Sequence, residues 1–240
     1  MTHAPHTDEP VTTLVSADAP HTVVVFCHGR GATAASLEPL AQAIARPGVA
    51  VLAPQASAIG GVPQWYPNSF LAPLDANEPA LGGALAAVDR AVEQARELGV
   101  ADAQIVLGGF SQGACLALET AARHAGRWGG VFALSGGLLG TGPGPADAPP
   151  LRGMGGSYAE KAFDYDGSMG GTPVLLGCSD RDPHIPLARV ERTAEVLADL
   201  GAEVDARVYP GMGHTINRDE LDAVRALLDE ADERAEGARP

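Results

Sequence analysis

Short apolar runs alternate along this chain with longer segments in which apolar residues recur every three or four positions, and this alternation restricts the possible fold. Most of the short runs are continuously apolar, which is typical of strands covered on both faces of a sheet. One run instead alternates, with Val204, Ala206 and Val208 on one side, and we expect it nearer a sheet edge. The predicted strands are residues 11–15, 22–27, 49–53, 104–108, 131–134, 173–177 and 203–209.

The segments between these strands have helical periodicity. Helices are predicted near residues 34–45, 81–98, 112–124 and 186–200, and a last one begins with Asn217 as N-cap and Glu220 three residues later, as in a capping box. Pro79 fits the first turn of the second helix and Gly99 fits the position just after its end. Strands and helices in alternation predict an α/β fold, with a mostly parallel, twisted sheet, helices on both faces and no separate cap domain.

A length of 240 residues suits a single domain, residues 1–240, with a large core. Residues 55–78 and 136–171 are long connections without clear periodicity, and such loops usually cover or border a functional site. Residues 1–10 and 232–240 are expected to be flexible ends.

Charge and composition exclude several classes of function. The formal net charge of −14 argues against binding to nucleic acid or to anionic membranes, because both need clustered positive charge. No apolar run approaches the roughly 20 residues of a membrane span, and the polar start lacks the features of a secretory signal, so a cytoplasmic location is expected. Cys27, Cys115 and Cys178 cannot all pair and are expected to be buried thiols in a reducing compartment.

A candidate nucleophile lies in Gly109-Phe110-Ser111-Gln112-Gly113, which matches G-x-S-x-G. The motif alone is weak evidence, because glycine supplies 30 of the 240 residues and a tight turn with a capping serine would look the same. Its setting is more specific: it directly follows a predicted strand and directly precedes a predicted helix. This strand–turn–helix arrangement presents a serine hydroxyl above the end of a sheet.

A serine hydroxyl needs a neighbouring base to take its proton. His28, His184 and His214 are the candidates, and His214 is favoured because it follows the last predicted strand and lies downstream of every candidate acid, giving the order serine, acid, histidine. Asp180 and Asp182 both follow the strand at 173–177, and local chemistry alone does not separate them.

The serine, the candidate acid and His214 each follow the carboxyl end of a different predicted strand, where open parallel sheets bind ligands. A fourth loop at this edge, residues 28–31, reads His-Gly-Arg-Gly. A backbone N–H from this loop and that of Gln112 are therefore expected to form an oxyanion hole.

The four motifs together, Gly-Phe-Ser-Gln-Gly, His-Gly-Arg-Gly, Asp-Pro-His-Ile-Pro (residues 182–186) and Gly-Met-Gly-His (residues 211–214), resemble the phospholipase/carboxylesterase family of the α/β-hydrolase fold, which includes bacterial carboxylesterases and acyl-protein thioesterases. The resemblance extends over residues 22–228. It implies that Asp182, the Asp before Pro, is the catalytic acid, and that the oxyanion donors are the amides of Arg30 and Gln112.

Two features depart from the family pattern. Residues 136–171 look longer than the matching connection in relatives. Arg30 stands where thioesterases usually carry an apolar residue, so its side chain either meets a polar or anionic acyl group, points to solvent or pairs with an acid.

The expected function is hydrolysis of small-molecule carboxylic esters through an acyl-enzyme, by a monomer or homodimer that needs no metal and no organic cofactor. Trp65, Tyr66, Phe70 and Leu71 are predicted to form an apolar wall of the substrate site, although ordinary core packing would explain them equally well. The alternatives are a thioesterase or lysophospholipase acting on long acyl chains, and a non-catalytic hydrolase-like binding protein.

Overall fold

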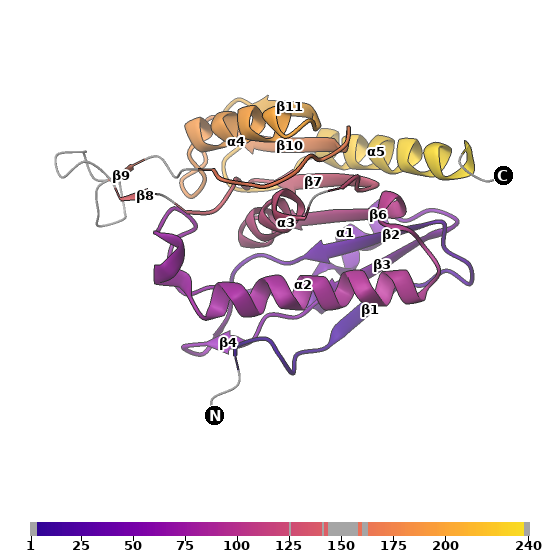
Figure 1. The fold of residues 1–240 in the computed structure, drawn as a ribbon, viewed down its shortest axis with the longest axis horizontal. Coiled ribbons are helices and arrows are strands. Elements are labelled where there is room, and N and C mark those ends of the chain that lie inside the picture. Colours follow the sequence, from indigo (N-terminus) through magenta and orange to yellow (C-terminus); the bar gives the residue numbers. More distant parts are fainter. Residues whose placement is uncertain (1–3, 125, 141, 144–157, 160–162, 238–240) are drawn as a thin grey trace.

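The computed structural model describes residues 4–124, 126–140, 142–143, 158–159 and 163–237 and is built around one seven-stranded sheet (Figure 1). The strand order is β1-β3-β2-β6-β7-β10-β11, in which β1 pairs antiparallel with β3 and every other pair is parallel. The sheet strands are β1 (Val11–Val15), β2 (Thr22–Cys27), β3 (Val49–Pro54), β6 (Ile105–Phe110), β7 (Gly130–Leu134), β10 (Pro173–Ser179) and β11 (Glu203–Tyr209).

Helices cover both faces of the sheet because alternate strand residues point to opposite sides. On one face, α2 (Ala80–Glu97), α3 (Gln112–Arg123) and α4 (Leu187–Asp199) pack in a cluster that includes Val23 and Val25. On the other face, α1 (Glu38–Ile44) and α5 (Arg218–Gly237) pack in a cluster that includes Val24 and Phe26. The continuously apolar β2 therefore contributes to two cores.

Smaller elements lie in the connections. The pairs β4 (Ala58–Ile59) with β5 (Val62–Pro63) and β8 (Gly142–Pro143) with β9 (Tyr158–Ala159) form two small antiparallel ladders. Three 3₁₀ helices span Ala34–Leu37, Leu74–Asn77 and Asp102–Gln104. Half of the long 136–171 connection, namely residues 141, 144–157 and 160–162, lies outside the described residues.

The predicted elements are confirmed, with shifts at their ends. All seven strands are present, and β11 lies at an edge of the sheet, as its alternating pattern indicated. The helix expected at 34–45 is a 3₁₀ turn followed by the shorter α1. The capping box before α5 is formed: the Glu220 N–H donates to Asn217 Oδ1 at 2.9 Å, and the Asn217 N–H donates to Glu220 Oε2 at 2.8 Å.

Both ends of the chain make contacts that the sequence did not indicate. In the segment expected to be a flexible start, His6 is 1% exposed, and its ring nitrogens accept the Ser57 N–H and bond the Trp65 carbonyl, each at 2.9 Å. In the segment expected to be a flexible end, Asp232 pairs with Arg46 at 3.0 Å as part of α5. The expectation of flexible ends is corrected for these two residues, because each buried or paired side chain ties its segment to the core.

All three cysteines are buried and free, as expected. Within the described ranges, no helix combines the length and the apolar character needed to cross a membrane.

Candidate active site

Ser111 occupies a sharp turn between the end of β6 and the start of α3. Its φ of 55° and ψ of −121° are unusual for a residue with a side chain, and such strain is found mainly at functional sites. The flanking glycines allow the turn: a Cβ on Gly109 would lie 2.3 Å from the backbone of Gly113, and one on Gly113 would lie 2.2 Å from the Cys27 carbonyl oxygen. The G-x-S-x-G pattern is therefore required by close backbone contact on both sides of the serine.

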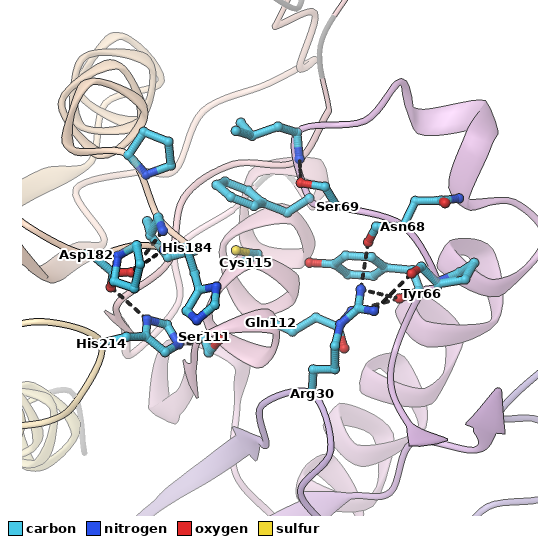
Figure 2. Close-up of a pocket in the computed structure, with 16 residues that line it drawn as sticks. Arg30, Tyr66, Asn68, Ser69, Ser111, Gln112, Cys115, Asp182, His184 and His214 are labelled. Carbon is cyan, nitrogen blue, oxygen red and sulfur yellow. Dashed lines mark hydrogen bonds and ion pairs between the residues drawn. The ribbon is translucent and has the colours of Figure 1, made fainter. Parts of the chain in front are cut away.

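The structure brings His214 and Asp182 to this serine from the loops after β11 and β10. His214 Nε2 lies 2.8 Å from Ser111 Oγ, and His214 Nδ1 lies 2.7 Å from Asp182 Oδ2 (Figure 2). The other carboxylate oxygen of Asp182 accepts the N–H groups of His184 at 2.8 Å and Ile185 at 3.0 Å. These contacts hold the carboxylate so that one oxygen is directed at the imidazole.

Hydrogen bonding also controls the charge of this carboxylate. Burial raises the pKa of Asp182, but the hydrogen bonds from His214 and from the two backbone amides outweigh it, so the pKa lies below its usual value. Asp182 is therefore ionised at neutral pH and can stabilise an imidazolium at His214.

Asp180, the competing acid, has a different partner. Its Oδ1 accepts the Gly211 N–H at 2.6 Å, and Ser179 Oγ accepts the Gly213 N–H at 3.0 Å. These two bonds hold the loop that carries His214 against the end of β10. Asp180 thus supports the histidine loop, and its carboxylate is not the one bonded to the imidazole.

His28, considered as a base, is buried beside this site with both ring nitrogens engaged. Its Nε2 accepts the Ala56 N–H at 3.1 Å, and its Nδ1 lies 2.9 Å from the Gly29 carbonyl oxygen. Burial lowers the pKa of His28, so the ring is neutral. Within the described part of the chain, its ring is hydrogen-bonded neither to Ser111 nor to a carboxylate.

The backbone N–H groups of Arg30 and Gln112 are unused. Neither donates a hydrogen bond to another described residue. The loop that carries Arg30 adjoins the serine, since a Cβ on Gly29 would lie 3.4 Å from Ser111 Cβ. Gln112 begins α3, so its N–H belongs to the unpaired first turn of that helix. Two free donors next to a serine hydroxyl can stabilise a developing oxyanion.

The side chains of Arg30 and Gln112 both form hydrogen bonds with the backbone of residues 65–68, in the loop that faces Ser111. Gln112 Oε1 accepts the Trp65 N–H at 2.9 Å, and Gln112 Nε2 donates to the Tyr66 carbonyl at 2.8 Å. The Arg30 guanidinium donates to the carbonyls of Pro67, Tyr66 and Asn68 at 2.9, 3.0 and 2.7 Å. The loop beside the serine is thus fixed by both residues whose amides are free.

A cavity of about 1090 Å³ opens over Ser111 and His214 (Figure 2). Three of the four residues predicted to form its wall, Tyr66, Phe70 and Leu71, line it. Trp65 is not among its lining residues: it is fully buried, and its Nε1 donates to the His28 carbonyl at 2.8 Å. For Trp65, the alternative of core packing is the one that the structure supports.

Among the described residues, no group of three or more His, Cys, Asp and Glu side chains is arranged to hold a metal ion.

The sequence profile of a family described as Phospholipase/Carboxylesterase matches residues 10–143 and 159–231. The chain belongs to the phospholipase/carboxylesterase family. As a member of that family it is an ester-hydrolysing serine hydrolase with the α/β-hydrolase fold.

Individual relatives agree with this assignment. The chain is 33% identical over 137 residues to an acyl-protein thioesterase 1 of Gibberella zeae, a match that covers 57% of this chain and 52% of that protein. It is 28% identical over 235 residues to an acyl-protein thioesterase 1 of Neurospora crassa, covering 90% of each chain. A solved phospholipase/carboxylesterase from Dyadobacter fermentans is similar with a TM-score of 0.78 and 35% identity, covering 95% of this chain and 98% of that one.

Arg30, a departure from the family pattern, is exposed and lines the cavity, and its guanidinium binds backbone carbonyls, a use that the sequence did not indicate. It pairs with no described acid, and its three carbonyl partners come from residues 36 to 38 positions away. Sequence reasoning missed this clamp because a backbone carbonyl has no signature in the amino-acid sequence.

Two aromatic rings contact the ring of His214. The His184 and His214 rings are edge to face, with their centroids 4.9 Å apart. The centroid of the Phe110 ring lies 5.0 Å from that of the His214 ring. The sequence could have indicated both contacts, because His184 is two residues from Asp182 and Phe110 directly precedes Ser111.

Proposed function

We propose that this protein is a serine carboxylesterase in which Ser111 is the nucleophile, His214 the general base and Asp182 the residue that orients it. The observation that carries the proposal is the continuous chain of contacts from Asp182 through His214 to Ser111, at 2.7 and 2.8 Å, beside two unused amides. A serine bonded to an imidazole that is itself oriented by a carboxylate is the arrangement needed for nucleophilic catalysis.

The proposed reaction begins when His214 Nε2 takes the proton of Ser111 Oγ as this oxygen attacks the ester carbonyl. The amides of Arg30 and Gln112 donate to the oxyanion of the tetrahedral intermediate, and each such donor contributes about 2.7–4 kcal/mol in comparable enzymes. His214 then gives its proton to the departing alcohol, which leaves an acyl-Ser111 ester. Water, deprotonated by His214, attacks this ester; the bond from the acyl carbon to Ser111 Oγ then breaks, Oγ takes the proton back from His214, and the carboxylic acid is released.

The direct test is covalent labelling of Ser111 with a fluorophosphonate, read by peptide mass spectrometry, together with the activity of Ser111→Ala on 4-nitrophenyl butyrate. We expect labelling at Ser111 alone and a loss in kcat of at least about 10³-fold with an unchanged melting temperature. Ser16→Ala, which alters an exposed serine far from the motif in sequence, is the matched control and should keep wild-type activity. Labelling elsewhere, or activity retained by Ser111→Ala, would contradict the assignment, and folded protein that does not label at all would favour a non-catalytic binding protein.

The second candidate is hydrolysis of longer acyl chains, as in a thioesterase or lysophospholipase. The observation that favours it is the name of the two curated relatives, both acyl-protein thioesterases. A chain-length series of 4-nitrophenyl esters separates the two candidates. Highest kcat/KM between C2 and C6 supports a small-ester enzyme, whereas activity that rises to C12 supports the long-chain candidate.

A further inference from the structure

The predicted apolar wall of the pocket contains a polar atom. Tyr66 lines the cavity, yet it is 1% exposed, and its hydroxyl has no hydrogen-bond partner among the described residues. Figure 2 shows the phenol extending from its loop toward Cys115 and the middle of the pocket. A buried hydroxyl without a partner is costly, and such groups are retained mainly where something else satisfies them.

Within the described residues, the protein offers this hydroxyl no strong hydrogen-bond partner. Its polar neighbour is the Cys115 thiol, a weak hydrogen-bonding group whose sulfur already accepts the Gly137 N–H at 3.4 Å. Gln112, which also faces the pocket, uses its amide on the backbone of Trp65 and Tyr66. Phe70 and Leu71, the other wall residues, also line the cavity and have apolar side chains.

Hydrogen bonds to the Tyr66 backbone fix the position of its phenol. The Tyr66 carbonyl accepts hydrogen bonds from Gln112 Nε2 at 2.8 Å and from the Arg30 guanidinium at 3.0 Å. Burial, with a further contribution from Cys115, raises the pKa of Tyr66 well above its usual value, so the hydroxyl keeps its proton. It is thus a preorganised neutral donor, and a donor fixed in advance loses little freedom on binding.

The position of Tyr66 decides which part of an ester it meets. The leaving oxygen must receive a proton from His214, so the alcohol part lies on the His214 side of Ser111. Figure 2 places Tyr66 on the opposite side of the pocket from His214, His184 and Asp182, with Ser111 and Gln112 between them. The acyl part of the ester therefore extends toward the phenol.

We propose that Tyr66 is a specificity-determining residue that selects acyl groups carrying a second, uncharged oxygen acceptor, such as an ether or ketone, over plain hydrocarbon chains. This inference rests on the proposed function of Ser111. A hydrocarbon chain that fills the pocket leaves the hydroxyl with only the weakly bonding Cys115 thiol beside it, whereas an oxygen at the right position accepts a hydrogen bond from it. A neutral acceptor fits better than a carboxylate, because the guanidinium of Arg30 is already bonded to three carbonyls.

The test is an oxygen scan with chain length held constant. The substrates are the 4-nitrophenyl esters of hexanoate, 4-oxahexanoate and 5-oxahexanoate, with each kcat/KM divided by the rate of alkaline hydrolysis of the same ester. The proteins are the wild type, Tyr66→Phe and, as matched control, Tyr209→Phe, whose hydroxyl bonds Asp219 outside the pocket lining. We expect one ether to be preferred over hexanoate by about 2- to 12-fold in the wild type and in Tyr209→Phe, and this preference to vanish in Tyr66→Phe.

Several results would overturn the inference. An ether-to-hexanoate ratio that is the same in Tyr66→Phe and the wild type would do so, since a structural role changes all substrates alike. If Tyr66→Phe does not fold, the wild-type rates still test the inference. A lower kcat/KM for both the 4-oxa and the 5-oxa ester than for hexanoate would exclude a hydrogen-bond donor in the acyl site. Preference for the 4-nitrophenyl ester of glutarate over both ethers would replace the proposed neutral acceptor with ionic recognition. Failure of the proposed function is distinct, because it leaves every ester unhydrolysed and Ser111 unlabelled.

Discussion

Replacing Arg30 by methionine removes the guanidinium while keeping the chain flexible and of similar length. The change deletes three hydrogen bonds, to the carbonyls of Tyr66, Pro67 and Asn68, and leaves the proposed oxyanion amide of residue 30 in the backbone. The net contribution of one hydrogen bond to stability is about 1 kcal/mol, so the loss of all three would cost at most about 3 kcal/mol of stability. Arg30 is exposed, however, so water can replace it at Pro67 and Asn68, while the Tyr66 carbonyl keeps its bond from Gln112. The expected loss of stability is therefore about 1–2 kcal/mol.

The effect on catalysis should appear mainly in substrate binding. The clamp holds the wall that includes Tyr66, whereas the serine and the imidazole are positioned by other strands. We expect KM to rise and kcat/KM to fall roughly tenfold, with a smaller change in kcat, since loss of a preorganised wall weakens binding. Steady-state kinetics on 4-nitrophenyl butyrate measure this, and thermal unfolding should show a decrease in Tm of roughly 3–6 °C.

Two comparison variants make the reasoning refutable. Arg96→Met removes an arginine with two exposed carboxylate partners, Asp102 and Glu93, and should cost no more than about 1 kcal/mol because such pairs are screened by solvent. Arg30→Lys keeps the charge but loses the planar fork that reaches three carbonyls, and it should behave like Arg30→Met. Wild-type KM and Tm in Arg30→Met, or full rescue by lysine, would show that the carbonyl clamp does not hold the wall.

Two further predictions concern stability. Gly113→Ala places a Cβ 2.2 Å from the Cys27 carbonyl oxygen and should cost about 3 kcal/mol or more in urea unfolding. Gly31→Ala has open space around its Cβ and should cost only the roughly 1–2 kcal/mol of its φ of 76°; equal losses would contradict the close-contact argument. Burial raises the pKa of Glu220 to about 7, so the native state keeps a proton that the unfolded state loses near pH 4.5. Stability should therefore fall by up to about 3 kcal/mol as the pH rises from about 4.5 to 7, and Glu220→Gln should reduce this dependence in melts at pH 5 and pH 8.

The elements of the fold could be predicted from the sequence because they depend on local patterns. A continuously apolar run such as 22–27 must be covered on both faces, and alternation with amphipathic helices leaves few topologies other than a parallel sheet. The turn at Ser111 is also local, since both glycines that it needs lie within two residues of it. The strands, the helices and this turn could therefore be predicted from the sequence without knowledge of tertiary contacts.

The partners of individual side chains depend on tertiary structure. Asp180 and Asp182 are chemically alike and two residues apart, and only the path of the loops after β10 and β11 sends one to the Gly211 amide and the other to His214. The neighbours Trp65 and Tyr66 likewise separate, one into the core and one onto the pocket wall.

The sequence by itself determined which strands end at the active edge and which reactive residue types stand there, because strand propensity and glycine-dependent turns act over a few residues. Tertiary structure alone decided that Arg30 binds carbonyls, that the Tyr66 hydroxyl has no strong partner among the described residues, and that His6 and Asp232 tie their segments to the core. Those outcomes depend on groups distant in sequence, often backbone atoms common to every residue, which no pattern of side chains encodes.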